Sequence, residues 1–204
     1  MATSPTVEPV RRSGAETRAE ICRVALEMFT TAGYEATSMR AIAEALGIRK
    51  ASLYYHFAGK EDILRSVFTQ RGSEAEELLE WIAAQPRTPQ LAKTAVLRWI
   101  ETFTTDKLRG IRFMAANPVL VRAVEEQTGS RIGNALTSLA DALTGLLPRR
   151  TPTDVLLLRI ALLSINAAVE ASAQADVNDD DVLAAAHSLA ETVMDSLLAA
   201  GDSA

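Results

Sequence analysis

The chain has 204 residues, of which 48% are hydrophobic and only 5% aromatic, and its net charge is -5 at pH 7. That length suits one large domain or two small ones with a substantial core. The single cysteine, Cys22, excludes an intrachain disulfide, and no stretch has the pattern of a signal peptide. Residues 1–65 hold nine Lys or Arg against eight Asp or Glu, and residues 66–204 hold twelve against eighteen. The acidity therefore lies in the C-terminal part and does not exclude a nucleic-acid partner for the N-terminal part.

Few aromatic residues, abundant Ala and Leu, and Pro and Gly between periodic segments predict an all-α fold. Residues 1–14 are rich in Ser, Thr and Pro and lack periodicity, so we expect a disordered tail. Arg11 and Arg12 in this tail could reach a minor groove, although a solvated tail is the simpler interpretation. The first helix is predicted over about 15–31, ending at Gly33, with the inner face Ile21, Val24, Ala25, Met28 and Phe29.

Residues 37–62 have the pattern of a helix-turn-helix. Met39, Ile42, Ala43 and Leu46 recur at the spacing of one buried helical face. Thr37 or Ser38 can cap this helix, and Gly47 suits a left-handed turn before a second helix over about 49–56. Two short amphipathic helices around a glycine also occur in many all-helical domains, so the pattern alone leaves the function open.

The outward residues of the second helix suit a DNA duplex. Arg49 and Lys50 stand at its start, the end that enters the major groove in helix-turn-helix proteins. Arginine can form paired hydrogen bonds with guanine, and lysine can reach a base or a phosphate. The Tyr55 hydroxyl and the Lys60 ammonium are candidate phosphate contacts. Lys60 opens the next helix, whose first backbone N–H groups also favour an anion.

The remaining periodic segments predict a second, helical domain. Breaks are expected at residues 86–89, at Asp106–Gly110 and at Asn117-Pro118, and Gly129 could interrupt the helix that Pro118 begins. The predicted helices cover about 60–84, 90–104, 111–115, 118–128, 132–146, 153–175 and 180–199. These boundaries give a tail over 1–14, a helix-turn-helix domain over 15–62 and a second domain over 63–204.

The last two predicted helices are candidates for a dimer interface. The segment 153–175 is apolar round most of its circumference, more than one core face requires. Together with the apolar stripe of 180–199 it could form a four-helix interface with a second copy. A monomer with a thick core is the alternative. Arg159, Asn166 and Glu170 argue against a membrane span, so we expect a cytoplasmic protein without a membrane partner.

Residues 17–68, about a quarter of the chain, resemble the DNA-binding domain of the tetracycline-repressor (TetR) family. The elements that carry the resemblance are Ala-Leu-Glu-Met-Phe at 25–29, Gly33-Tyr34, Met39–Ala43, Leu46-Gly47-Ile48, Leu53–Phe57 and Lys60-Glu61. The resemblance implies a three-helix N-terminal domain followed by a larger helical domain that binds a ligand and dimerises.

The resemblance also assigns roles to individual positions. Candidate DNA-binding residues are Thr37, Ser38, Arg49, Lys50, Ser52, Tyr54, Tyr55 and Lys60. One position departs from the family, which usually has Ser or Thr where Arg49 stands to cap the recognition helix. Arginine has no side-chain acceptor, so the cap should be weaker by about 1 kcal/mol. We hypothesise that Arg49 contacts a base or phosphate instead.

The effector pocket is harder to place. Trp99, Phe103, Phe113, Met114 and Asn117 lie where the family has its pocket, although large apolar side chains at helical spacing are more often plain core. Arg159, Asn166, Glu170 and Gln174 share one face if 153–175 is a single helix, either as a solvent stripe or as ligand contacts. We expect a small hydrophobic or amphipathic effector, and no cofactor or metal.

The sequence supports a regulator better than an enzyme. It has two histidines, His56 and His187, and no phosphate loop, metal-ligand motif or serine elbow. We therefore predict a homodimeric transcriptional repressor that binds a palindromic double-stranded DNA operator and is released by an effector. The alternative is a regulator controlled by a protein partner, which would have a poorly hollowed second domain, whereas a ligand needs a cavity of a few hundred Å³.

Overall fold

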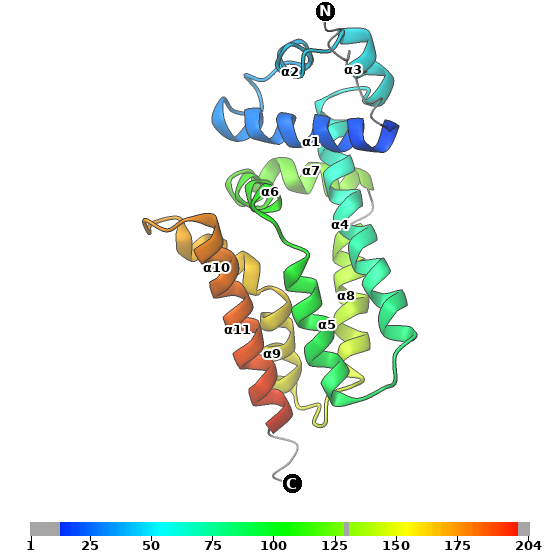
Figure 1. The fold of residues 1–204 in the computed structure, drawn as a ribbon, viewed down its shortest axis with the longest axis vertical. Helices are drawn as coiled ribbons and strands as arrows, with labels where there is room; N and C mark the ends of the chain where they lie inside the picture. Colours follow the sequence, from blue (N-terminus) through cyan, green and yellow to red (C-terminus); the bar gives the residue numbers. More distant parts are fainter. Residues whose placement is uncertain (1–12, 129–130, 200–204) are drawn as a thin grey trace, which may run out of the picture. The chain divides into compact units, whose positions relative to one another are not determined.

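The computed structural model describes residues 13–128 and 131–199, and every regular element in these ranges is an α-helix (Figure 1). The predicted all-α class is confirmed. The helices of the described ranges are α1 (Gly14–Thr31), α2 (Met39–Ala45), α3 (Lys50–His56), α4 (Lys60–Ala83), α5 (Pro89–Glu101), α6 (Thr105–Ala116), α7 (Pro118–Thr128), α8 (Arg131–Thr144), α9 (Pro152–Leu162), α10 (Ser164–Ser172) and α11 (Asp179–Ala199). The predictions on Arg11, Arg12 and most of the 1–14 tail lie outside the described residues, as does the interruption at Gly129.

The chain divides after Ile63 into two compact units. In the first unit, α1 begins at a capping box in which the Ser13 hydroxyl accepts from the Glu16 amide at 3.2 Å and the Glu16 carboxylate accepts from the Ser13 amide at 2.6 Å. The buried apolar residues of the unit come from α1, α2, α3, their connections and the first turn of α4: Ile21, Cys22, Ala25, Leu26, Phe29, Tyr34, Met39, Ile42, Ala43, Leu53, Phe57 and Ile63. Val24 and Met28, predicted to face inward, are only half-buried.

The turn between α2 and α3 depends on Gly47. Its φ is +65°, in the left-handed region where a side chain is strained. The Gly47 amide donates to the Glu44 carbonyl at 3.1 Å, and the Ile48 amide donates to the Ala43 carbonyl at 3.0 Å. This pair of bonds is a Schellman motif, and it satisfies carbonyls at the end of α2 that the helix itself leaves unpaired. The left-handed turn predicted at Gly47 is confirmed.

The second unit is a helical domain around one large apolar core. α11 packs against α5, α9 and α10, and Figure 1 shows α5, α9 and α11 side by side. The innermost residues come from α5, α6, α8, α9 and α11 and include Ala92, Ala95, Val96, Leu108, Leu139, Leu143, Leu158, Ala161, Ala186, Ala190 and Met194. α11 begins at a cap in which Asn178 Oδ1 accepts from the Asp181 amide at 2.9 Å.

The break predicted at Asp106–Gly110 is wrong. α6 begins at Thr105, and the break lies at residues 102–104 instead. The Thr104 hydroxyl accepts from the Lys107 amide at 3.4 Å and caps the helix there. Gly110 is buried within α6, so this glycine marks a helix interior and not a turn.

The single helix predicted over 153–175 is also wrong. The segment forms α9 and α10, which meet at Leu163 and are bent by 59°. At the break the Asn166 amide donates to the Leu163 carbonyl at 2.9 Å, which leaves the Leu162 carbonyl without its usual helical partner. The Trp99 indole N–H donates to that Leu162 carbonyl at 3.2 Å. A side chain from α5 therefore stabilises the bend by satisfying a buried acceptor.

By length and composition α11 could cross a membrane, as could α9 and α10 if taken as one span. One face of α11 is nevertheless buried, through Val182, Ala186, Ala190, Met194 and Leu197. These residues belong to the apolar core that α11 shares with α5, α9 and α10. The packing of α11 is therefore that of a core helix in a globular domain.

Replacing Gly47 by Ala tests the turn that precedes α3. The new Cβ would meet no atom within 4 Å, so the cost is the strained backbone alone. We expect the free energy of unfolding to fall by about 1 kcal/mol in urea titrations followed by circular dichroism. Gly14→Ala is the matched control, because Gly14 also has open space around its Cβ position but no positive φ. Equal stability of the two variants would contradict the role given to Gly47.

Candidate nucleic-acid interface and effector cavity

The outward face of α3 carries five candidate DNA-binding residues. Arg49, Lys50, Ser52, Tyr54 and Tyr55 are all exposed, and Tyr55 is 86% exposed, an unusual value for a tyrosine. The opposite face of α3 is fixed in the core through Leu53, and Phe57 follows at its C-cap, with exposed fractions of 0% and 1%. The structure therefore brings five of the eight predicted residues together on one short helix that is anchored in the core by Leu53 and Phe57.

The N-terminus of α3 lacks a side-chain cap. Arg49 is the N-cap residue, and its side chain accepts no hydrogen bond from the first turn, as the sequence predicts. The exposed guanidinium is thus available for contacts outside the chain. Lys50 is the next residue, and its ammonium lies 5.5 Å from the centroid of the Tyr54 ring one turn along α3. This places two cations at the end of the helix whose dipole also favours a phosphate.

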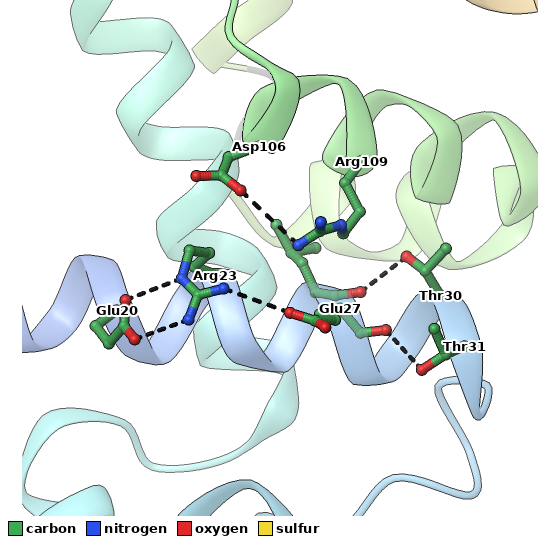
Figure 2. Close-up of polar contacts among 8 residues, drawn as sticks. Glu20, Arg23, Glu27, Thr30, Thr31, Asp106 and Arg109 are labelled. Carbon is green, nitrogen blue, oxygen red and sulfur yellow. Dashed lines mark hydrogen bonds and ion pairs between the residues drawn. The ribbon is translucent and has the colours of Figure 1, made fainter. Parts of the chain in front are cut away.

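The C-terminus of α3 is held by Arg18 of α1. Arg18 Nη1 donates to the His56 carbonyl, and the guanidinium carbon lies 4.0 Å above the centroid of the Phe57 ring. Further along α1, Arg23 forms ion pairs with Glu20 at 2.8 Å and Glu27 at 3.4 Å (Figure 2). Arg18 therefore makes its contacts inside the unit, where it satisfies a terminal carbonyl of α3.

The other three predicted DNA-binding residues differ in position. Ser38 is exposed and caps α2, with its hydroxyl accepting from the Ala41 amide at 3.1 Å. The Thr37 side chain is only 2% exposed, and its hydroxyl donates to the Gly33 carbonyl at 2.8 Å. The half-buried Lys60 donates to the Tyr34 carbonyl at 2.7 Å. The Thr37 and Lys60 side chains thus make hydrogen bonds to backbone carbonyls within the unit.

The predicted effector residues do not lie together in the second unit. Trp99, Phe103, Met114 and Asn166 line one cavity of about 150 Å³. Glu170 lines a different cavity of about 410 Å³, beside Arg112 and Val177. Phe113 is buried core, and the Asn117 side-chain amide donates to its carbonyl at 2.8 Å. Because α9 and α10 are separate helices, the shared face predicted for Arg159, Asn166, Glu170 and Gln174 is wrong, and Gln174 lies beyond the end of α10.

Comparison with known proteins decides the family. The family model described as "Bacterial regulatory proteins, tetR family" matches residues 21–67, the stretch that contains α2, α3 and the exposed residues above. The segment 21–67 belongs to the TetR family.

Two curated regulators and a solved structure agree with this assignment. The chain is 31% identical to the transcriptional regulator AcrR of Shigella flexneri, over 48% of this chain and 47% of that protein. It is 34% identical to the repressor KstR2 of Mycolicibacterium smegmatis, over 50% of this chain and 42% of that protein. The matched stretches thus cover less than half of either curated relative.

A solved structure extends the likeness in fold to most of the chain. A TetR-family regulator from Bordetella parapertussis matches 89% of this chain and 94% of its own at 22% identity, with a TM-score of 0.64. At that identity the match shows the fold, an N-terminal helix-turn-helix with a helical C-terminal domain. It carries no information on the effector.

Two residues that the sequence reasoning missed adjoin the candidate sites. Arg40 is an exposed cation on α2, and its i,i+4 ion pair with Glu44 at 2.7 Å could have been read from their spacing. Arg71 lines the 150 Å³ cavity. Its spacing in the sequence could have indicated a buried position, because it falls at helical spacing among the buried residues Phe68, Ala75, Leu78 and Ile82 of α4. A charged residue at such a core position needs an explanation.

Substituting Arg49 by Ser separates its two proposed roles. Ser can accept the hydrogen bond that Arg49 cannot, so the free energy of unfolding should rise by about 0.5–1 kcal/mol. Affinity for a cognate duplex should fall about tenfold if the guanidinium contacts a base or phosphate. Urea unfolding and fluorescence anisotropy measure the two effects. The Arg49→Lys control keeps the charge and should gain no stability, and unchanged DNA affinity in Arg49→Ser would falsify the contact.

Proposed function

We propose that the chain is a transcriptional repressor that binds a palindromic operator as a homodimer and is released by a small effector. The observation that carries this proposal is the exposed face of α3, where Arg49, Lys50, Ser52, Tyr54 and Tyr55 lie within the residues that match the family. In this proposal residues 15–62 bind DNA and residues 63–204 bind the effector and dimerise. Such a protein acts in the cytoplasm, and it is a regulator and not an enzyme, as its relatives are.

The chemistry of the α3 face fits the major groove of a duplex. Arg49 and Lys50 supply charge for phosphates and donors for base edges, while Ser52 and the two tyrosine hydroxyls add neutral donors. The seven residues of α3 form about two turns, which is enough to present one face to a few base pairs. We assign base reading to Arg49 and Lys50, and phosphate contact to Tyr55. Ser38 and the backbone beside Thr37 and Lys60 are assigned to the flanking phosphates.

Control by a small molecule is favoured over control by a protein partner. The second unit has a cavity of about 410 Å³ beside Glu170, which meets the few hundred Å³ expected for a ligand. It also has one of about 150 Å³, on whose wall four predicted effector residues meet from α5, the turn after α5, α6 and α10. A regulator that responds only to a protein partner needs no such hollow. The effector shifts the protein toward a form that fits the operator poorly, and it does so only through its different affinities for the two forms.

Selection of duplexes from a random-sequence library with the purified chain tests DNA binding directly. We expect an inverted repeat whose half-sites lie about 34 Å apart, the spacing of successive major grooves on one side of the helix. In the selected duplex, Lys50→Ala should reduce affinity about tenfold and lower the salt dependence by about one counterion. Arg87→Gln removes an exposed cation of the second unit and should change neither quantity. Recovery of no enriched sequence would overturn the proposal.

The homodimer is proposed to form through α9, α10 and α11. Large apolar side chains of α9, of its junction with α10 and of α11 lie at the surface of the single chain, namely Leu156, Ile160, Leu163 and Leu189, which are 38–59% exposed. Leu156 and Ile160 are four residues apart on α9 and therefore share one face. Covering these side chains with the same surface of a second copy would form a two-fold interface.

Introducing a carboxylate at Leu156 tests that interface. The wild-type chain should sediment at twice the 22.0 kDa mass of one chain. Leu156→Glu should sediment as a monomer under the same conditions, because an unpaired charge is costly to bury in an apolar contact. Val119→Glu is the control, since Val119 is a still more exposed apolar residue that lies on α7. If Leu156→Glu remains dimeric, the interface lies elsewhere.

A further inference from the structure

The 150 Å³ cavity of the second unit combines an apolar wall with one buried cation. Ten of its twelve lining residues are apolar, including Trp99, Phe103 and Met114. Arg71 is the one charged residue among them, and Asn166 supplies the only neutral polar group. The Arg71 side chain is just 13% exposed. A guanidinium in such a place is unusual, because arginine is almost never buried without a partner.

Two aromatic rings hold the Arg71 guanidinium in position. Its central carbon lies 4.0 Å from the centroid of the Phe103 ring and 4.6 Å from that of Trp99. The two rings are perpendicular to each other, with centroids 5.5 Å apart. Stacking on aromatic faces restricts the side chain and favours its charged form at this place. The group is therefore pre-oriented before any ligand enters.

The charges around Arg71 do not balance. Arg71 Nη1 donates to Glu74, and the other Glu74 oxygen accepts from the Lys107 ammonium at 2.8 Å. One carboxylate thus serves two cations, which leaves this cluster with one net positive charge. Among the described residues, no acceptor contacts Nε or Nη2 of Arg71. Burial lowers the pKa of the Arg71 guanidinium, with Glu74 opposing that shift, as expected for a cation withdrawn from water.

The size of the cavity limits what can occupy it. A dry cavity of about 150 Å³ in another protein accommodates one benzene ring. A molecule that fits the space lined by Trp99, Phe103 and Met114 therefore has an apolar part of about the size of one ring. A carboxylate attached to that ring could reach the free edge of the guanidinium, and Arg–carboxylate pairs are strong when partly shielded from water.

We propose that the effector of this protein is a small aromatic carboxylate, whose charged group pairs with Arg71 and whose ring lies against Trp99 and Phe103. This inference rests on the proposed function, because it takes the cavity as the effector site. It narrows the expected hydrophobic or amphipathic ligand to an organic anion. It also explains why a charged residue occupies a core position of α4.

Phenylacetate and its neutral analogue phenylacetamide test the proposal without any mutation. The two probes have nearly the same size and shape, so a difference in affinity reports the charge. Titration of the full-length chain, followed by calorimetry and by Trp99 fluorescence in a Trp81→Phe background, should show that the carboxylate binds at least about tenfold more tightly. Equal or tighter binding of the amide would overturn the proposal, as would the absence of any response to phenylacetate.

Variants of Arg71 locate the source of the preference. In Arg71→Gln the ratio of the two affinities should fall to near one, and in Arg71→Lys part of the preference should remain. The ratio is taken within each variant, so a general loss of stability that weakens both ligands does not imitate the effect. Arg98→Gln is the matched control, because Arg98 lies 4.7 Å from the centroid of the Trp81 ring and does not line the cavity. A preference that survives in Arg71→Gln would overturn the assignment.

The DNA measurements keep the two proposals distinguishable. Ligand binding is measured without DNA, so failure to select a duplex contradicts the proposed function and not the chemistry of the cavity. An amide that binds as well as the carboxylate contradicts only the anionic effector. Release of the selected duplex by phenylacetate, with no release by phenylacetamide at the same concentration, would support both.

Discussion

The shortness of α3 is the constraint on which the N-terminal unit depends. A helix of seven residues is not stable alone in water, so the contacts around it must hold it in shape. Leu53 and Phe57 bury one side, the Gly47 turn fixes its start, and Arg18 satisfies a carbonyl at its end. Because these contacts all lie inward or at the termini, the outward side is free to carry polar residues chosen for a partner. The rigidity of α3, the proposed DNA-binding helix, thus comes from the residues that surround it.

The second unit accommodates polar groups in an apolar core by giving each a specific partner. The Trp99 indole N–H donates to the Leu162 carbonyl, which the bend between α9 and α10 has left open, while its ring face lies against Arg71. One side chain therefore contacts both the cavity and the bend that leads to the proposed dimer surface. In the proposed function, an occupant that presses on Trp99 would change the support of that bend, which gives a physical route from ligand to interface.

The sequence predicted local features well and long-range ones poorly. The bounds of α2 and α3 and the turn at Gly47 depend on residues within one turn of each other, and those predictions agree with the structure. The prediction of one helix over 153–175 failed because the segment is apolar on most sides and has neither Gly nor Pro at the break. No pattern in the sequence therefore marks Leu163 as the end of a helix. The hydrogen bond that stabilises this bend joins residues 63 positions apart. Likewise, nothing local to Arg71 places it over Trp99 and Phe103, although its position in the buried stripe of α4 was visible.

The distribution of two residue types gives each unit its own natural reporter. The one thiol, Cys22, is buried in the first unit, while both tryptophans, Trp81 and Trp99, belong to the second. Thiol-reactive dyes can reach Cys22 only when α1 separates from its neighbours, and indole emission follows the second unit alone. Opening of the two units can therefore be timed independently in the unmodified chain, which would reveal whether they unfold as one cooperative body or in sequence.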